Sequence, residues 1–234
     1  MTRALVPLSM TTIELLPERC RGCVAWELDS AGVRAAVKLG ETEFEKEVWL
    51  SGVMLTWGSA GQIVTVDEQP VGFALFAPPT AVPGAAAFPT SPVSPDAVLL
   101  TAAKILPEFT GQGLARYLMN GVVTALTRRG VRAIELFGLE DDPIADPDDP
   151  PDTRGPVESV PDPDLPRCLL PAGFARAVGF EDVAPHFRYP RLRFELGRDI
   201  GWKAEVESAL EKLFTVITVP ASPSPLVPEL VGQR

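Results

Sequence analysis

Apolar residues along this chain follow the two periods that distinguish strands from helices. Residues 62–66 and 71–77 are apolar-rich runs on either side of the polar turn 67–69, a pattern that predicts a β-hairpin. Residues 98–106 form a continuous apolar run that Pro107 ends, as expected for a fully buried strand. Further strands are predicted over 10–16, 131–137, 181–186 and 191–196.

Helical periodicity is clearest after a glycine-rich turn at 110–113. An apolar residue recurs at every fourth position from Leu114 to Leu126, and Gly130 then provides a stop. This spacing predicts a helix with one apolar face. Other helices are predicted over 18–28, 42–57, 171–178 and 199–214.

The helix predicted over 42–57 begins with an acidic turn, which suits the positive end of the helix dipole. Gly58 and Gly61 are expected to end it. Its apolar residues fall roughly on one side of the helix, so we expect a buried face there, made of Phe44, Val48, Leu50, Met54 and Leu55.

Charge and proline are concentrated in three segments. Residues 139–166 contain ten acidic residues, one arginine and eight prolines, and carry −9 of the net charge of −10. Segments 78–95 and 220–228 hold six and four more of the 25 prolines. Such stretches bury too little apolar surface to offset their ordering entropy, so we interpret them as loops or disorder. With 46% apolar residues among 234, the chain can still build an ordinary globular core.

The charge balance and the cysteine count exclude several classes of protein. A net charge of −10 argues against broad nucleic-acid binding, which needs a basic surface. No run approaches the roughly 20 apolar residues of a membrane span, and the first apolar stretch is too short for a signal peptide. Three cysteines are too few for a disulfide framework, so we expect a cytoplasmic protein with reduced thiols.

A strand–turn–helix unit at 99–116 carries the clearest chemical signal. Its glycines let the backbone turn sharply and approach a ligand closely. The helix that follows begins with free N–H groups, which suit a phosphate, and Arg116 adds a charged donor. The sequence contains no Walker loop, and Arg116 stands where a dinucleotide fingerprint requires its third glycine.

The acetyl-CoA loop of the GNAT superfamily of N-acetyltransferases resembles the string at 105–116, ILPEFTGQGLAR. The family pattern is Val-x-Pro-x-aromatic followed by Arg/Gln-x-x-Gly-x-Gly/Ala, and Thr110 is the one departure from it. The family's second signature, Leu-Tyr-x-x-x-Gly-Phe, resembles the segment at 174–180, FARAVGF. The order of predicted elements also agrees, so the resemblance covers about 10–196.

The resemblance implies an α/β (α+β) fold with a mixed, mostly antiparallel sheet that is flanked by helices and partly split around acetyl-CoA. It also implies acetyl-CoA as co-substrate and direct attack on the thioester by a primary amine of a small molecule or a protein. No covalent enzyme intermediate would form. The residues that the resemblance assigns to the cofactor are Ala103, Lys104, Ile105, Gly111, Gln112, Gly113, Leu114, Ala115, Arg116 and Cys168.

The catalytic residues are less well defined. Ala175 stands where many family members carry a tyrosine that protonates the leaving thiolate, so the usual general acid is missing. Glu27 and Glu135 are candidate bases for the acceptor amine, although each also fits a plain solvated role. The alternative hypothesis is a GNAT-fold sensor or partner-binding protein that holds CoA without turnover.

The Cys20-x-x-Cys23 pair allows three interpretations. It could hold a structural zinc ion together with Cys168 and His186, it could be a redox pair, or its thiols could be small buried hydrophobes. One such pair without a second is a weak metal signal, so we expect no metal site. We expect a structural role for His186.

The expected organisation is one GNAT-like domain over 1–198, with loop insertions at 78–97 and 139–166, followed by a helix and flexible tail over 199–234. The acidic insertion fits a plain solvated linker. Alternatively, because it lies between the strand and the helix that flank the acceptor cleft in GNAT folds, its charge would attract a cationic amine. The apolar face of 199–214 could pack on this domain or on a second subunit, which leaves a homodimer open.

Overall fold

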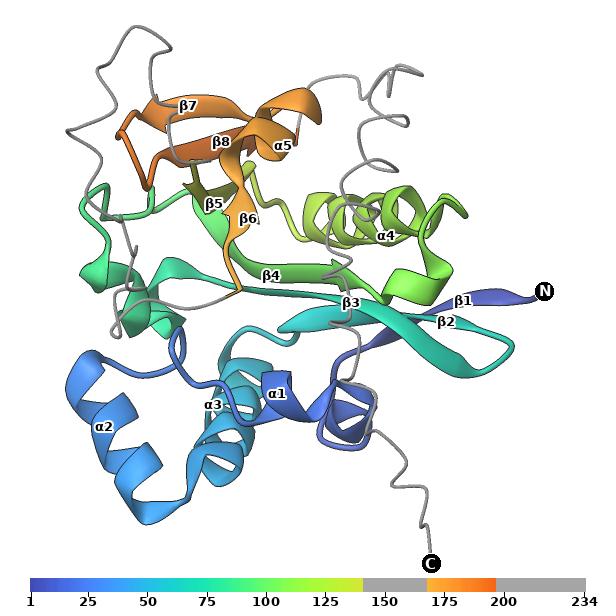
Figure 1. Ribbon diagram of the computed structural model, residues 1–234, viewed down its shortest axis with the longest axis horizontal. Coiled ribbons are helices and arrows are strands. Elements are labelled where there is room, and N and C mark those ends of the chain that lie inside the picture. The colour runs from blue at the N-terminus through green and yellow to red at the C-terminus, as the bar shows by residue number, and fades with distance from the viewer. Residues whose placement is uncertain (141–167, 197–234) are drawn as a thin grey trace, which may run out of the picture.

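The computed structural model describes residues 1–140 and 168–196. The helix predicted over 199–214 and almost all of the acidic segment 139–166 lie outside the described residues. Within them, one sheet is formed (Figure 1). Its strands are β1 (Arg3–Pro7), β2 (Gly61–Val66), β3 (Gln69–Ala77), β4 (Ala97–Ile105), β5 (Ala133–Leu139), β6 (Leu170–Pro171), β7 (Glu181–Ala184) and β8 (Arg191–Glu195).

The strands are arranged in the order β1-β2-β3-β4-β5-β8-β7, with β6 beside β5. Neighbouring strands are antiparallel except at β4–β5 and β5–β6, which are parallel. This confirms the expected fold class, a mixed and mostly antiparallel sheet. The predicted hairpin corresponds to β2 and β3, and the predicted buried strand corresponds to β4.

Helices lie on both faces of this sheet, as Figure 1 shows. The helix predicted after the glycine-rich turn forms as expected and is followed by Gly130, whose φ of +72° suits a glycine. The short helix predicted from Pro171 also forms. One face carries α4 (Leu114–Arg128) and α5 (Ala172–Ala177), and the other carries α1 (Glu18–Arg21), α2 (Ser30–Leu39) and α3 (Thr42–Thr56).

The run 10–16, predicted as a strand, is instead a turn followed by a 3₁₀ helix at Ile13–Leu15. The Thr12 hydroxyl accepts a hydrogen bond from the Ser9 amide at 2.8 Å and donates one to the Pro7 carbonyl at 2.8 Å. These bonds give the backbone a local alternative to strand pairing. The edge strand is therefore formed upstream, by β1.

The helical region after residue 17 also departs from the prediction. The helix predicted over 18–28 is shorter and ends at Arg21. The helix α2 lies outside every predicted helix, although Asp29 caps its start by accepting from the Gly32 amide at 2.7 Å and Gly40, with a φ of +72°, ends it. The helix α3 forms as predicted, but its buried residues are Lys46, Leu50 and Val53, whereas Phe44, Val48 and Leu55 are exposed.

The proline-rich segment 78–95 is an ordered loop. It forms two 3₁₀ helices, and the ring of Phe88 stacks on Trp26 at 5.1 Å and on Phe137 at 4.2 Å between centroids. A Cβ at Gly84 would lie 1.9 Å from the Ala25 carbonyl oxygen, so only glycine allows this close approach. The apolar residues between the prolines give this segment the buried surface that its proline content alone does not suggest.

Candidate functional site

The sheet splits between β4 and β5. These strands pair only at residues 97–99 with 133–135, and β5 then pairs with β6 at Gly138 instead. The register of β3 against β4 shifts beside Thr101, which has no opposite residue. Bulges of this kind re-aim backbone groups and are frequent beside binding sites. The end of β4 therefore borders an opening in the sheet.

The loop before α4 has the geometry that its glycines predict. Gly111 and Gly113 have φ values of +75° and +69°, a region that favours glycine. Gly113 precedes the first turn of α4, and no side chain caps it. A Cβ at either glycine would meet nothing within 4 Å, so the space beside the loop is open. The first amides of α4 can therefore meet an anion such as a pyrophosphate.

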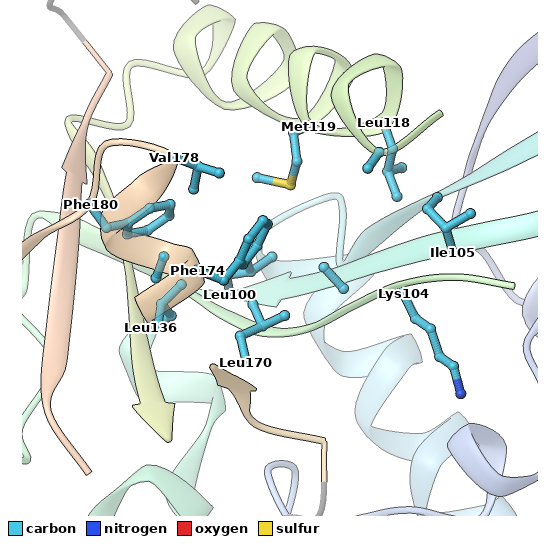
Figure 2. A pocket seen from close by; sticks show the side chains of 13 residues that line it. Leu100, Lys104, Ile105, Leu118, Met119, Leu136, Leu170, Phe174, Val178 and Phe180 are labelled. Atoms are coloured by element: carbon cyan, nitrogen blue, oxygen red, sulfur yellow. The ribbon is translucent and has the colours of Figure 1, made fainter. Parts of the chain in front are cut away.

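An apolar pocket lies between the split strands, α4 and α5 (Figure 2). It spans about 510 Å³, including the part that is open to solvent. Lys104 is its one charged lining residue, and Figure 2 shows this side chain pointing away from α4. The lining residues are Leu100, Ala103, Lys104, Ile105, Ala115, Leu118, Met119, Leu136, Leu170, Phe174, Ala175, Val178 and Phe180.

The cofactor residues expected from sequence fall into three places. Ala103, Lys104, Ile105 and Ala115 line the pocket. Gly111, Gln112, Gly113, Leu114 and Arg116 lie in the loop and the first turn of α4 at its end. Cys168 precedes β6 and does not line the pocket.

No motif in the sequence identifies most of the remaining residues as lining a pocket. Leu118 and Met119 belong to the periodic pattern of α4, and Leu136 belongs to a buried strand. Phe174 and Phe180 fall in the second family signature, which is the signal that could have assigned them to the pocket. Ala175 is fully buried and contributes a methyl group, so no hydroxyl reaches the pocket from this position.

Cys168 lies on the side of the sheet that α3 covers. Its sulfur accepts a hydrogen bond from the indole N–H of Trp26 at 3.3 Å, and its S–H donates to the Thr101 carbonyl oxygen at 3.7 Å. A hydrogen bond with Cys168 lowers the pKa of the Cys23 thiol to about 6, although burial opposes this shift. The same bond and burial raise the pKa of Cys168.

A buried ion pair lies beside these thiols. Glu27 and Lys46 are 4% and 3% exposed, and the Lys46 ammonium donates to Glu27 Oε1. The same ammonium donates to the Cys23 carbonyl oxygen at 2.7 Å. Glu27 Oε2 has no hydrogen-bond partner within the part of the chain that the structure describes. Burial of a carboxylate oxygen without a partner is costly, so this oxygen is suited to meet a ligand.

Glu135 has a different environment. It is fully buried, and its two oxygens accept from the Ser94 amide at 3.1 Å, from Arg191 and from Arg193 at 3.1 Å. Burial alone would raise the pKa of this carboxyl, but the bonds from Ser94 and both arginines lower it. Glu135 is therefore an ionised anchor for β8, with both oxygens engaged.

His186 and the cysteines form no metal centre within residues 1–140 and 168–196, where no three His, Cys, Asp or Glu side chains are grouped to hold an ion. His186 Nδ1 accepts from the amides of Arg188 at 3.1 Å and Tyr189 at 2.9 Å, which fixes the turn before β8. The three cysteines are free thiols.

The described residues thus form a split, mixed sheet, with the glycine-rich loop and the apolar pocket at the split. The sequence profile of the Acetyltransferase (GNAT) family matches residues 21–146, which is more than half of the chain, and the chain belongs to this family. The family transfers acetyl groups and uses acetyl-CoA as co-substrate. No curated protein matches the sequence.

Several solved structures are similar in fold. The PaiA N-acetyltransferase of Thermoplasma acidophilum in complex with coenzyme A is 11% identical, with a TM-score of 0.48, over 83% of this chain and 99% of that one. An N-acetyltransferase of Staphylococcus aureus is 10% identical, with a TM-score of 0.48, over 84% and 99%. The ribosomal-protein-S18-alanine N-acetyltransferase of Escherichia coli is 12% identical, with a TM-score of 0.43, over 84% and 96%.

Among the described residues, no helix has both the length and the apolar character that a bilayer crossing requires.

Proposed function

We propose that this protein is an N-acetyltransferase that moves the acetyl group of acetyl-CoA to a primary amine of a small molecule or a protein. The observation that carries the proposal is the apolar pocket at the split, with the uncapped start of α4 at its end. The amides of residues 113–116 would hold the pyrophosphate, and residues 103–105 would hold the pantetheine arm. The thioester then lies near the bulge at Thr101.

The reaction is a direct attack of the neutral amine on the thioester carbonyl. The C–N bond forms, the C–S bond breaks, and the CoA sulfur leaves as a thiolate. A thiol has a pKa near 8.5, so this leaving group needs little acid assistance at neutral pH. The absence of a tyrosine at Ala175 is therefore compatible with turnover, provided that positioning and a backbone N–H on the carbonyl supply most of the rate.

Glu27 is the better supported of the two candidate bases, because its Oε2 is unpartnered in the described part of the chain. The oxygens of Glu135 are both occupied by donors. In this proposal Glu27 accepts the proton of the acceptor amine, directly or through one water. A Glu27→Gln variant should lower kcat/KM about 100-fold with the acetyl-CoA KM unchanged. An unchanged kcat/KM in a folded variant would exclude this role.

A second candidate function is a protein that binds CoA without turnover. The buried methyl group of Ala175 in the tyrosine position favours it. A panel of amine acceptors, together with a test of acetyl-CoA hydrolysis, separates the two functions. Turnover on any amine supports the enzyme, and tight CoA binding with no turnover supports the sensor.

Acetyl-CoA should raise the melting temperature by about 5 °C at a hundredfold excess over its Kd. Gly113→Trp should abolish this shift, because the indole would occupy the open space where the pyrophosphate is expected. Gly130→Trp is the matched control, since it also has a positive φ and open space but lies at the other end of α4. If saturating acetyl-CoA gives no shift and no heat of binding, the cofactor assignment fails.

We also propose that the acceptor is cationic. The support is compositional, since residues 139–166 carry a net charge of −9. Neutral substitutions there should raise the KM for the amine and leave the KM for acetyl-CoA unchanged.

We further propose that the protein is cytoplasmic and forms a homodimer. Light scattering of the purified protein tests the dimer.

A further inference from the structure

Among the described residues, none exposes a polar atom on the walls of the pocket between β4, α4 and α5. The side chain of Lys104 points away from α4, as Figure 2 shows. An amide that entered this space would lose its hydrogen bonds to water and gain none from the protein, which is unfavourable. The amide groups of a pantetheine arm therefore do not suit this space, whereas an alkyl chain does.

The open edge of β4 offers those amide groups a better place. β4 and β5 pair only through residues 97–99, and beyond them β5 gives β4 no further backbone partner within the described part of the chain. The backbone donors and acceptors of residues 103–105 on this edge can therefore bind amide groups. The pantetheine arm of the proposed function lies along this edge, which leaves the apolar pocket beside it for another group.

The pocket extends away from the glycine-rich loop. Figure 2 shows Ile105, which precedes this loop, at one end of the pocket. Leu136 and Phe180 lie at the opposite end, and both are buried. The thioester of the proposed function lies near Thr101, next to the lining residue Leu100, so a chain on its acyl group would enter the end that is far from the loop.

We propose that the preferred acyl donor carries a short unbranched chain longer than acetyl, such as butyryl, which lies in this pocket. The inference rests on the proposed function and specifies its acyl donor, with acetyl-CoA as a substrate that fits less well. The pocket spans about 510 Å³, including the part that is open to solvent, whereas an acetyl group carries only one methyl group beyond its carbonyl.

The chemistry of transfer is the same for the longer donor. The amine nitrogen forms a bond to the acyl carbonyl carbon, and the C–S bond breaks. The CoA sulfur leaves as a thiolate, and the amine loses one proton to Glu27, directly or through one water. The chain itself takes no part in the reaction and contributes through the apolar surface that it buries.

Ala175 limits the length of chain that the pocket accepts. It is fully buried on α5 and lines the pocket with a methyl group. A larger side chain at this position would occupy the space that the acyl chain needs. Ala177 is on the same helix but is exposed and does not line the pocket, so the same substitution there is a matched control.

Calorimetry of the wild-type protein with CoA, acetyl-CoA, butyryl-CoA and hexanoyl-CoA tests the proposal. Each methylene group that leaves water for the apolar pocket should tighten binding about fourfold, so butyryl-CoA should bind about 15-fold more tightly than acetyl-CoA. Equal dissociation constants for these two esters would overturn the proposal.

Two substitutions should change the preference in opposite directions. Ala175→Leu should remove the advantage of butyryl-CoA and leave the Kd for CoA unchanged, while Ala177→Leu keeps the wild-type preference. Phe174→Ala should increase the preference for hexanoyl-CoA over butyryl-CoA, because Figure 2 shows this ring inside the pocket. The Phe174 variant provides the test if Ala175→Leu does not fold. A folded Ala175→Leu protein that keeps the full preference would overturn the proposal.

The binding measurements separate this inference from the proposed function. They need no acceptor amine, so an absence of turnover leaves the acyl preference measurable. Binding of CoA with no preference among the acyl groups would contradict the acyl selectivity alone. No binding of any CoA ester would contradict the proposed function and this inference together. If the enzyme is active, kcat/KM should be higher for butyryl-CoA than for acetyl-CoA, and Ala175→Leu should reverse this order.

Discussion

The two sides of the split in the sheet have opposite character. On the side of α4 and α5, every residue that lines the pocket is apolar except Lys104, whose side chain points away. The other side holds the buried Glu27–Lys46 pair and the Cys168 thiol, which contacts Trp26. An acyl-CoA arm needs only an apolar pocket and backbone amides, whereas proton transfer needs titratable groups. We infer that the sheet separates cofactor binding from chemistry.

Glu135 belongs to the polar side as well. Its neighbours in β5, Ile134 and Leu136, pack in the cluster under α4, and side chains alternate along a strand. Glu135 therefore points to the opposite face, where Arg191 and Arg193 hold it. A buried charge is tolerated only when it is paired, so loss of one partner on this side should be costly and, at Glu135, should depend on pH, unlike the loss of an apolar side chain elsewhere.

The largest effect is expected from Lys46→Met. This substitution keeps the apolar stem but leaves the Glu27 carboxylate buried without its counter-ion. We expect a loss of about 3 to 5 kcal/mol in the free energy of unfolding, measured by urea denaturation. The Glu27→Leu and Lys46→Met double variant should recover most of it, since both charges are then gone. A double variant as unstable as the single one would contradict the ion-pair explanation.

Glu135→Gln should have a smaller effect that depends on pH. The folded pKa of Glu135 lies below its usual value, so its stabilisation is present above pH about 5 and is lost as pH falls through the folded pKa. At pH 7 we expect a loss of about 2 to 3 kcal/mol. Below pH 4 the difference from wild type should shrink, because a protonated glutamate resembles glutamine.

Leu126→Ala on the apolar side is the matched control for this prediction. Leu126 is a fully buried residue of α4, and its truncation should cost about 3 kcal/mol at both pH values. If the loss in the free energy of unfolding depends on pH equally in Glu135→Gln and Leu126→Ala, the two sides of the sheet do not differ in their charge interactions.

The apolar side could largely be predicted from the sequence, and the polar side could not. The α4 helix, the glycine loop and β4 follow from local patterns, because periodicity and turn residues act over a few positions. The interaction of Glu27 with Lys46 depends on how α3 is rotated, and the exposure of Phe44 shows that its apolar pattern misplaces the buried face. Cys168 reaches Trp26, 142 positions away in the sequence, only through the order of strands in the sheet.

The smallest effect is expected from Trp26→Phe, which tests the polar side at a single N–H group. The substituted ring can still stack on Phe88 and Phe137, so the packing of the proline-rich segment should persist. The hydrogen bond from the indole N–H to the Cys168 sulfur is lost. We expect a loss of about 0.5 to 1 kcal/mol in the free energy of unfolding, measured by urea denaturation. A loss of about 3 kcal/mol or more, as for truncation of a buried aromatic ring, would point to a general loss of packing rather than to the N–H group.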